Sequence, residues 1–225
     1  MLTVNAASGF GSGGVIAPMV LEDGGSGVES GNHSSKTFSS VGIGTAASNR
    51  IVVVMSGISS VVASGITIGG SAATKIVELD SGGAVASIWA LAVTSGTTAD
   101  IVCSISATTG AQAIYVAAMY GADISPHATA TSDEDTPAPM SASLEIPAGG
   151  AAFGSAMYTH PSGYQSFVWS NLTEKADITS TYTYVDFTMA QTAVGGQTPT
   201  ITCTVSSSGS ANDRCAMALA SFGPA

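Results

Sequence analysis

Charged side chains are scarce in this chain. Its 225 residues include five Lys and Arg and fifteen Asp and Glu, or 9% of the sequence, whereas about a quarter is usual in globular domains. Ser, Thr, Gly and Ala stand where charge would normally be. Because 45% of the residues are still hydrophobic, the chain has enough apolar material for a packed core. This composition excludes a disordered tail of high net charge.

Positive charge is the scarcest kind, and the formal net charge is −10. The cations are scattered along the chain, at Lys36, Arg50, Lys75, Lys175 and Arg214. Such spacing provides no basic stripe that would release counterions from a phosphate backbone. Binding to an anionic membrane surface is disfavoured for the same reason. We therefore expect neither nucleic acid nor membrane as a partner.

Long apolar runs are also missing. The opening MLTVNAASGFGSGG has neither the cationic start nor the continuous apolar core of a signal peptide. No stretch approaches the roughly 18 apolar residues of a membrane-spanning helix. The sequence predicts a soluble protein that is made in a cytoplasm and is not exported by a cleaved leader.

Cysteine is rare, and its spacing matches no zinc or redox motif. The three residues are Cys103, Cys203 and Cys215. One interpretation is that all three are small buried hydrophobic residues. The other is a Cys203–Cys215 bridge across adjacent strands of a hairpin near Gly209, which requires a specific Cβ geometry.

Helical periodicity is absent, and short alternating or apolar runs are separated by Gly, Ser, Asn or Pro. This pattern is typical of an antiparallel β-sandwich or barrel. The predicted strands form two sets of seven, near residues 36–42, 50–57, 64–69, 72–79, 86–93, 99–106 and 112–120, and near residues 140–146, 149–158, 166–170, 173–178, 182–190, 199–206 and 214–222.

The two sets end alike. DIVCSIS at 100–106 aligns without a gap with TITCTVS at 200–206, and 113–121 aligns with 215–223 after an insertion of two residues. We interpret this as internal duplication, in which each copy ends in a hairpin. About 85 residues and seven strands suit an immunoglobulin-like sandwich, and one larger jelly roll is the alternative.

Four segments follow from this reading: a Gly/Ser-rich N-terminal arm at 1–35, a first β-sandwich half at 36–122, a solvated linker at 123–139, and a second half at 140–225. The arm carries the apolar island VIAPMVL at 15–21, which a free linker does not need. It packs either on its own domain or on a neighbouring subunit.

Catalytic patterns are missing as well. His33, His127 and His160 fall in segments expected to be exposed, and no nucleophile elbow, zinc-binding helix or phosphate-binding loop is present. The acidic triplet at 133–135 suggests either calcium or, more simply, a solvated linker. We assign no catalytic, cofactor-binding or metal-binding residue and expect a protein that is not an enzyme.

A group of aromatic residues suggests a sugar-binding site. Tyr158, His160, Tyr164 and Trp169 lie close together in the sequence, and exposed rings can stack on sugar faces. Trp169 stands in an apolar strand, however, so a core position is the competing interpretation, as it is for Trp89.

Several motifs resemble a known group. The runs NRIVVVMSG, GITIGGSAATKIVEL and SIWALAVTSGTTADIVCSIS, with IPAGGAAFGSAMY, FVWSNLTEKADI and CAMALASFGP later, are similar to β-sandwich proteins encoded in tailed bacteriophages and prophages. The resemblance covers about residues 36–223. It implies a virion component such as a capsid decoration protein, head spike or fibre, and it carries over no catalytic residue.

The resulting expectation is a non-enzymatic structural component of a phage virion. It would lie on the head surface as a homo-oligomer, with the major capsid protein or other virion proteins as partners. The alternative is a carbohydrate-binding tail fibre or spike module for host attachment, with a surface glycan as its ligand.

Overall fold

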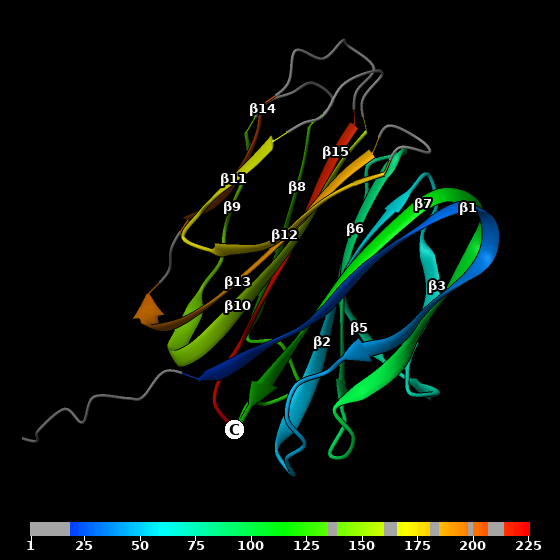
Figure 1. Ribbon diagram of the computed structural model, residues 1–225. Coiled ribbons are helices and arrows are strands. Elements are labelled where there is room, and N and C mark those ends of the chain that lie inside the picture. Colours follow the sequence, from blue (N-terminus) through cyan, green and yellow to red (C-terminus); the bar gives the residue numbers. More distant parts are fainter. Residues whose placement is uncertain (1–18, 135–138, 160–165, 181–184, 198–199, 207–213) are drawn as a thin grey trace, which may run out of the picture.

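The protein is all-β, with antiparallel sheets (Figure 1). The computed structural model describes residues 19–134, 139–159, 166–180, 185–197, 200–206 and 214–225. Within these ranges no helix is long and apolar enough to cross a membrane.

The strands of the first half form one seven-stranded sheet that folds over on itself. Its central part has the order β5-β6-β2-β7-β1, and a second layer contains β1, β7, β3 and β4. The strands are β1 (Val20–Gly42), β2 (Arg50–Ser59), β3 (Ala63–Ile68), β4 (Ser71–Ala72), β5 (Thr74–Asp80), β6 (Ala84–Ala92) and β7 (Thr98–Tyr120).

The second half forms two separate sheets, with the orders β12-β13-β10-β15-β8 and β11-β14-β9. Its strands are β8 (Ala128–Glu134), β9 (Met140–Ser143), β10 (Ile146–Thr159), β11 (Ser166–Ser170), β12 (Thr173–Ser180), β13 (Val185–Gln197), β14 (Thr200–Ser206) and β15 (Arg214–Phe222).

The central strands are buried on both faces, which explains their nearly continuous apolar sequences. Every residue of β2 is buried. Val53 and Met55 point into a core shared with the second half, whereas Val52 and Val54 point into the core of the first half. A third core fills the second half, around Trp169. Each half is thus a sandwich, and the two sandwiches are fused face to face.

The long strands β1 and β7 run as a pair through both layers of the first half, the curved ribbon on the right of Figure 1. Residues 20–30 of β1 pair with the end of β7, and residues 33–42 pair with its beginning, with register shifts between. The predicted hairpin between 99–106 and 112–120 is therefore wrong. Strand β7 continues from one layer into the other because its beginning pairs with β3 and its end pairs with β2.

Strand pairing is the same in the two halves. In the order β5-β6-β2-β7-β1 each strand has its counterpart in β12-β13-β10-β15-β8. Both edge strands carry a bulge at the same place, one residue after Lys75 in β5 and one after Glu174 in β12. Internal duplication explains these correspondences, although common descent of the halves stays a prediction.

The predicted alignment of the final strands is off by one residue. We matched the bulges of β5 and β12 and followed the register through the strands paired with them. Val116 of β7 then corresponds to Leu219 of β15. Both side chains point into the core of their own half, whereas the sequence alignment placed Val116 over Ala218, which faces the other half. A slip of one residue in a strand exchanges its two faces.

The halves pack with an approximate two-fold relationship. Strand β2 contacts its own counterpart β10. The contact of β6 with β15 has its equivalent in that of β7 with β13, and the contact of β5 with β8 has its equivalent in that of β1 with β12. Each contact thus occurs together with its equivalent, as in the isologous interface of a two-fold dimer. Many of the side chains between the sheets are alanines, among them Ala86, Ala113 and Ala218, which allow the sheets to approach closely.

The predicted arm and linker need correction. From Val20 onward the supposed arm is an edge strand of the first half, and residues 128–134 of the supposed linker form β8, an edge strand of the second. The glycines of β1 serve packing here. A Cβ at Gly24 would lie 2.6 Å from the carbonyl oxygen of Val116, and one at Gly27 would lie 2.7 Å from the ring of Phe38.

Arg50, the first residue of β2, is fully buried. Its guanidinium donates hydrogen bonds of 2.7–2.9 Å to the carbonyl oxygens of Gly44, Val93, Ser95 and Gly96. The planar fork of donors suits several carbonyls at once. Arg50 therefore holds together two loops at one end of the first sandwich.

Candidate functional site

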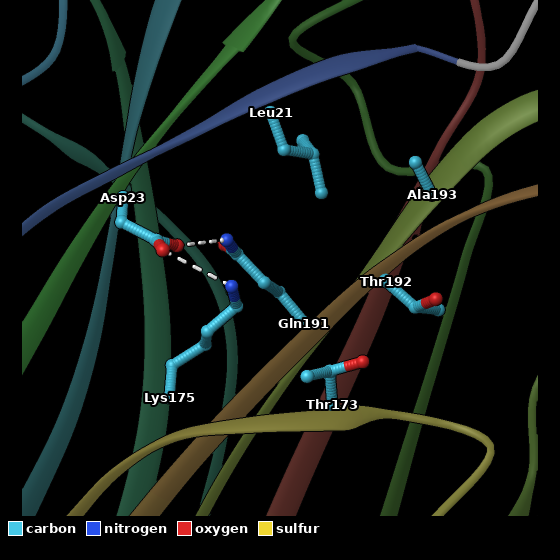
Figure 2. Close-up of a pocket in the computed structure, with 7 residues that line it drawn as sticks. All are labelled: Leu21, Asp23, Thr173, Lys175, Gln191, Thr192 and Ala193. Carbon is cyan, nitrogen blue, oxygen red and sulfur yellow. Dashed lines mark hydrogen bonds and ion pairs between the residues drawn. The ribbon is translucent and has the colours of Figure 1, made fainter.

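A polar pocket opens where the two halves meet, between the edge strands β1 and β12 (Figure 2). Its volume is about 310 Å³, and the residues that line it are Leu21, Asp23, Thr173, Lys175, Gln191, Thr192 and Ala193. Residues from β1 in the first half thus face residues from β12 and β13 in the second.

Asp23 is at the centre of the hydrogen bonds in this pocket. Its Oδ1 accepts from the hydroxyl of Tyr115 and from Nε2 of Gln191, both at 2.7 Å. Its Oδ2 lies 3.1 Å from Nζ of Lys175. Figure 2 shows Lys175 and Gln191 converging on this carboxylate from the second half. The same contacts fasten β1 to β12 and β13.

The surroundings keep Asp23 ionised. Its partial burial acts to raise the pKa, but the hydrogen bond from Tyr115 and the hydrogen bond and charge of Lys175 outweigh it, so the net pKa of Asp23 is lowered. Burial, and then Asp23, raise the pKa of the Tyr115 hydroxyl. Tyr115 therefore stays a hydrogen-bond donor at neutral pH.

Gln191 is only 3% exposed. Its amide nitrogen is bonded to Asp23, while its Oε1 has no hydrogen-bond partner in the described part of the protein. A buried amide oxygen without a partner is costly and uncommon. This atom is therefore the least satisfied polar group of the pocket.

The other half of the protein provides an internal comparison, because the same framework occurs there without the polar groups. Strand pairing makes Ile76 the counterpart of Lys175, Ala90 the counterpart of Gln191, and Ala218 the counterpart of Tyr115. All three belong to the shared core or pack against it. Asp23 corresponds to Thr129. The fold therefore does not require a charged cluster at this position.

The groups of the pocket are arranged to bind a ligand by hydrogen bonds and not for acid–base or nucleophilic chemistry. Asp23 and Lys175 are partners and neutralise each other. No histidine or cysteine belongs to the lining. Carboxylate, ammonium, amide and threonine hydroxyls instead offer a mixture of hydrogen-bond donors and acceptors. This mixture suits a small polar ligand.

The aromatic residues suggested for sugar stacking are not exposed where they are described. Tyr158 is fully buried and Trp169 is 9% exposed, both in the core of the second half. The Trp169 indole also donates a hydrogen bond of 2.8 Å to the hydroxyl of Thr188. The core interpretation is confirmed for Trp169 and for Trp89. His160 and Tyr164 lie outside the described residues.

The histidines and acidic residues that the structure describes do not gather into a site. His33 is exposed on β1, and His127 lies 3.4 Å from Glu145 through Nε2 and Oε1. Of the acidic triplet, Asp133 is exposed on β8 and Asp135 lies outside the described residues. In the part of the chain that the structure describes, no three His, Cys, Asp or Glu residues are placed to hold a metal ion.

Two of the cysteines are buried, as one interpretation predicted. Cys103 lies in the core of the first half, and burial raises the pKa of its thiol to about 12. Cys215 lies in the core of the second half. The expected hairpin between β14 and β15 does not form, because each pairs within a different sheet. The side chain of Cys203 lies outside the described part, so the bridge stays a prediction.

Sequence reasoning missed the pocket altogether. Asp23 was assigned to an arm, Lys175 was one of several scattered cations, and Gln191 was not considered. Asp23 and Gln191 are separated by 168 residues, so no local spacing links them. The usable signal was the weak resemblance of TKIVELD to TEKADIT, which places an unmatched lysine on an edge strand.

Comparisons of the chain with protein-family models, with curated proteins and with solved structures found no significant match.

Proposed function

We propose that the protein is a non-enzymatic structural component of a phage virion, carried in multiple copies on the head surface. The observation that best supports this role is the fusion of two sandwiches through a broad shared core, which makes a stiff block with little charge. The sequence resemblance to phage β-sandwich proteins points the same way. The proposed partners are other copies of the chain and the major capsid protein.

A surface of Ser, Thr, Gly and Ala suits such a role, because these side chains lose little rotamer entropy on assembly. Many weak identical contacts then add up over a symmetric shell. The outer sheet of the second half also ends in an edge strand, β11, on which Val168 is 60% exposed. Edge strands can pair across subunits.

The head-surface role is tested by adding purified chain to particles assembled without it. We expect saturable binding that co-sediments with the particles. Residues 1–18 precede the strand that belongs to the first sandwich. A variant that lacks them tests separately whether this segment anchors the chain to the particle. Wild-type occupancy by that variant would refute anchoring by this segment, and the absence of saturable binding by the full chain would refute the head-surface role.

The second candidate function is carbohydrate recognition by a tail fibre or spike module. It is favoured by the polar pocket between the halves, in place of the exposed aromatic rings first expected. A glycan array probed with the full-length chain tests this function, and an array without any signal at high protein concentration would count against it.

A further inference from the structure

We propose that the pocket between β1, β12 and β13 binds a single neutral sugar ring, held by Asp23, Lys175 and Gln191. This inference rests on the second candidate function, carbohydrate recognition, and gives it a site. It does not depend on where the protein is placed in a particle.

The pocket groups have hydrogen-bonding capacity to spare. Among the interactions of the described residues, Oδ2 of Asp23 accepts from Lys175 alone, and Nζ of Lys175 donates to that oxygen alone. A carboxylate oxygen has two acceptor sites and an ammonium group has three donors. Neighbouring sugar hydroxyls donate and accept at once, so two of them can bridge the carboxylate and the ammonium without breaking the ion pair.

Charge favours a neutral ligand. Asp23 and Lys175 are held together at 3.1 Å and their charges cancel. An anion would gain from Lys175 and be repelled by Asp23, and a cation would meet the reverse. A polyhydroxylated ligand gains charge-assisted hydrogen bonds from both groups, and these bonds are the stronger kind.

Size and shape limit the ligand to one ring. A volume of about 310 Å³ is at the lower end of small-molecule sites. Leu21 and Ala193 supply an apolar wall beside the hydroxyls of Thr173 and Thr192. A sugar ring has the same division, with C–H groups on a face and hydroxyls around the rim.

Gln191 also points to a ligand, because it is buried and its Oε1 has no hydrogen-bond partner in the described part of the chain. At the corresponding place in the other half stands Ala90, which packs in the shared core. The fold is complete with an alanine at this position in one half, so it does not need the incompletely bonded amide in the other. We infer that the amide serves a ligand. A sugar hydroxyl that reaches Oε1 would supply the missing hydrogen bond.

The test uses saturation-transfer NMR on the full-length chain with the methyl glycosides of glucose, galactose, mannose and N-acetylglucosamine. We expect one of them to bind with a dissociation constant on the order of 1 mM, as for a shallow site with few contacts. Lys175→Met should weaken that binding by roughly tenfold or more, because a hydrogen bond to a charged group is lost.

Lys75→Met is the matched control. Lys75 lies on β5, the counterpart of β12, and pairs with Glu78 instead of facing the pocket, so this variant should bind like the wild type. Asp23→Asn and Gln191→Ala should weaken binding as Lys175→Met does. Thermal unfolding of each variant shows whether it is folded.

The outcomes separate the site from the function. Sugar binding that Lys175→Met leaves unchanged would overturn the proposed site while carbohydrate recognition stands. Absence of binding by every glycoside, together with an array without signal, would overturn both. Binding of free amino acids in place of sugars would also contradict the proposal, because a zwitterion would place its ammonium on Asp23 and its carboxylate on Lys175 and would need no sugar hydroxyl.

Discussion

Gly57 of β2 lies directly against the ring of Phe187 of β13, so that a Cβ at Gly57 would collide with the ring. Phe187 is fully buried in the core that the two halves share. The glycine thus makes room in one sandwich for a large side chain from the other. This contact is a direct measure of how closely the halves fit.

Gly57→Ala should therefore destabilise the protein. An added methyl group in a packed core typically costs about 1–3 kcal/mol, and the free energy of unfolding from urea titration measures it. Gly65→Ala in β3 is the matched control, because a Cβ there meets nothing within 4 Å. Equal effects of the two variants would contradict the close packing of the halves.

Arg50→Lys should be strongly destabilising although the charge is kept. Four carbonyl oxygens depend on the guanidinium, and an ammonium group cannot reach all of them from one position. The loss of several hydrogen bonds from a charged donor leads us to expect a destabilisation of roughly 3 kcal/mol. A midpoint of urea unfolding equal to that of the wild type would show that the loops do not need this residue.

Protonation of Asp177 on β12 at acidic pH should stabilise the folded protein. Burial, and then the charge of Asp186, raise the pKa of Asp177. Between the unfolded pKa of about 4 and the higher folded value, the folded state binds more protons than the unfolded state. Stability therefore falls as pH rises through this window.

Asp177→Asn should remove this cost and raise the free energy of unfolding at neutral pH, by less than about 1 kcal/mol because the group is partly solvated. Its benefit should disappear below the window. Asp133→Asn, at an exposed carboxylate of β8, serves as the comparison. A gain that persists undiminished at low pH would refute the electrostatic explanation.

Cys103 should resist thiol reagents in the folded protein. It is fully buried, and its pKa of about 12 leaves almost no thiolate at neutral pH. Alkylation followed by peptide mass spectrometry should find Cys103 modified only after denaturation. The same peptides show whether Cys203 and Cys215 are bridged. Rapid modification of Cys103 under native conditions would contradict its place in the core.

Much of the fold could be predicted from the sequence, because buried strands carry a clear pattern. The bounds predicted for the strands at 166–170 and 214–222 agree with β11 and β15. Two edge strands were missed, β8 and the part of β1 before residue 36. Residues 20–35 look like a linker because the sheets need glycines such as Gly24 there, and the polar residues of β8 face solvent.

The pocket could not be predicted, since its parts meet only through the packing of the two halves. Asp23 gives no local sign that Lys175 and Gln191 will face it. The register of the halves decides which residues meet. An error of one residue, as in the alignment of Val116, changes which face a side chain occupies.

The most direct test of the virion role is the composition of the particles themselves. Particles from the proposed phage or prophage source are purified on a density gradient, and the chain is quantified by mass spectrometry against the major capsid protein. The account predicts that the chain co-purifies at a fixed ratio in every intact particle fraction. Its absence from purified particles, with abundant chain left in the lysate, would contradict the proposed function.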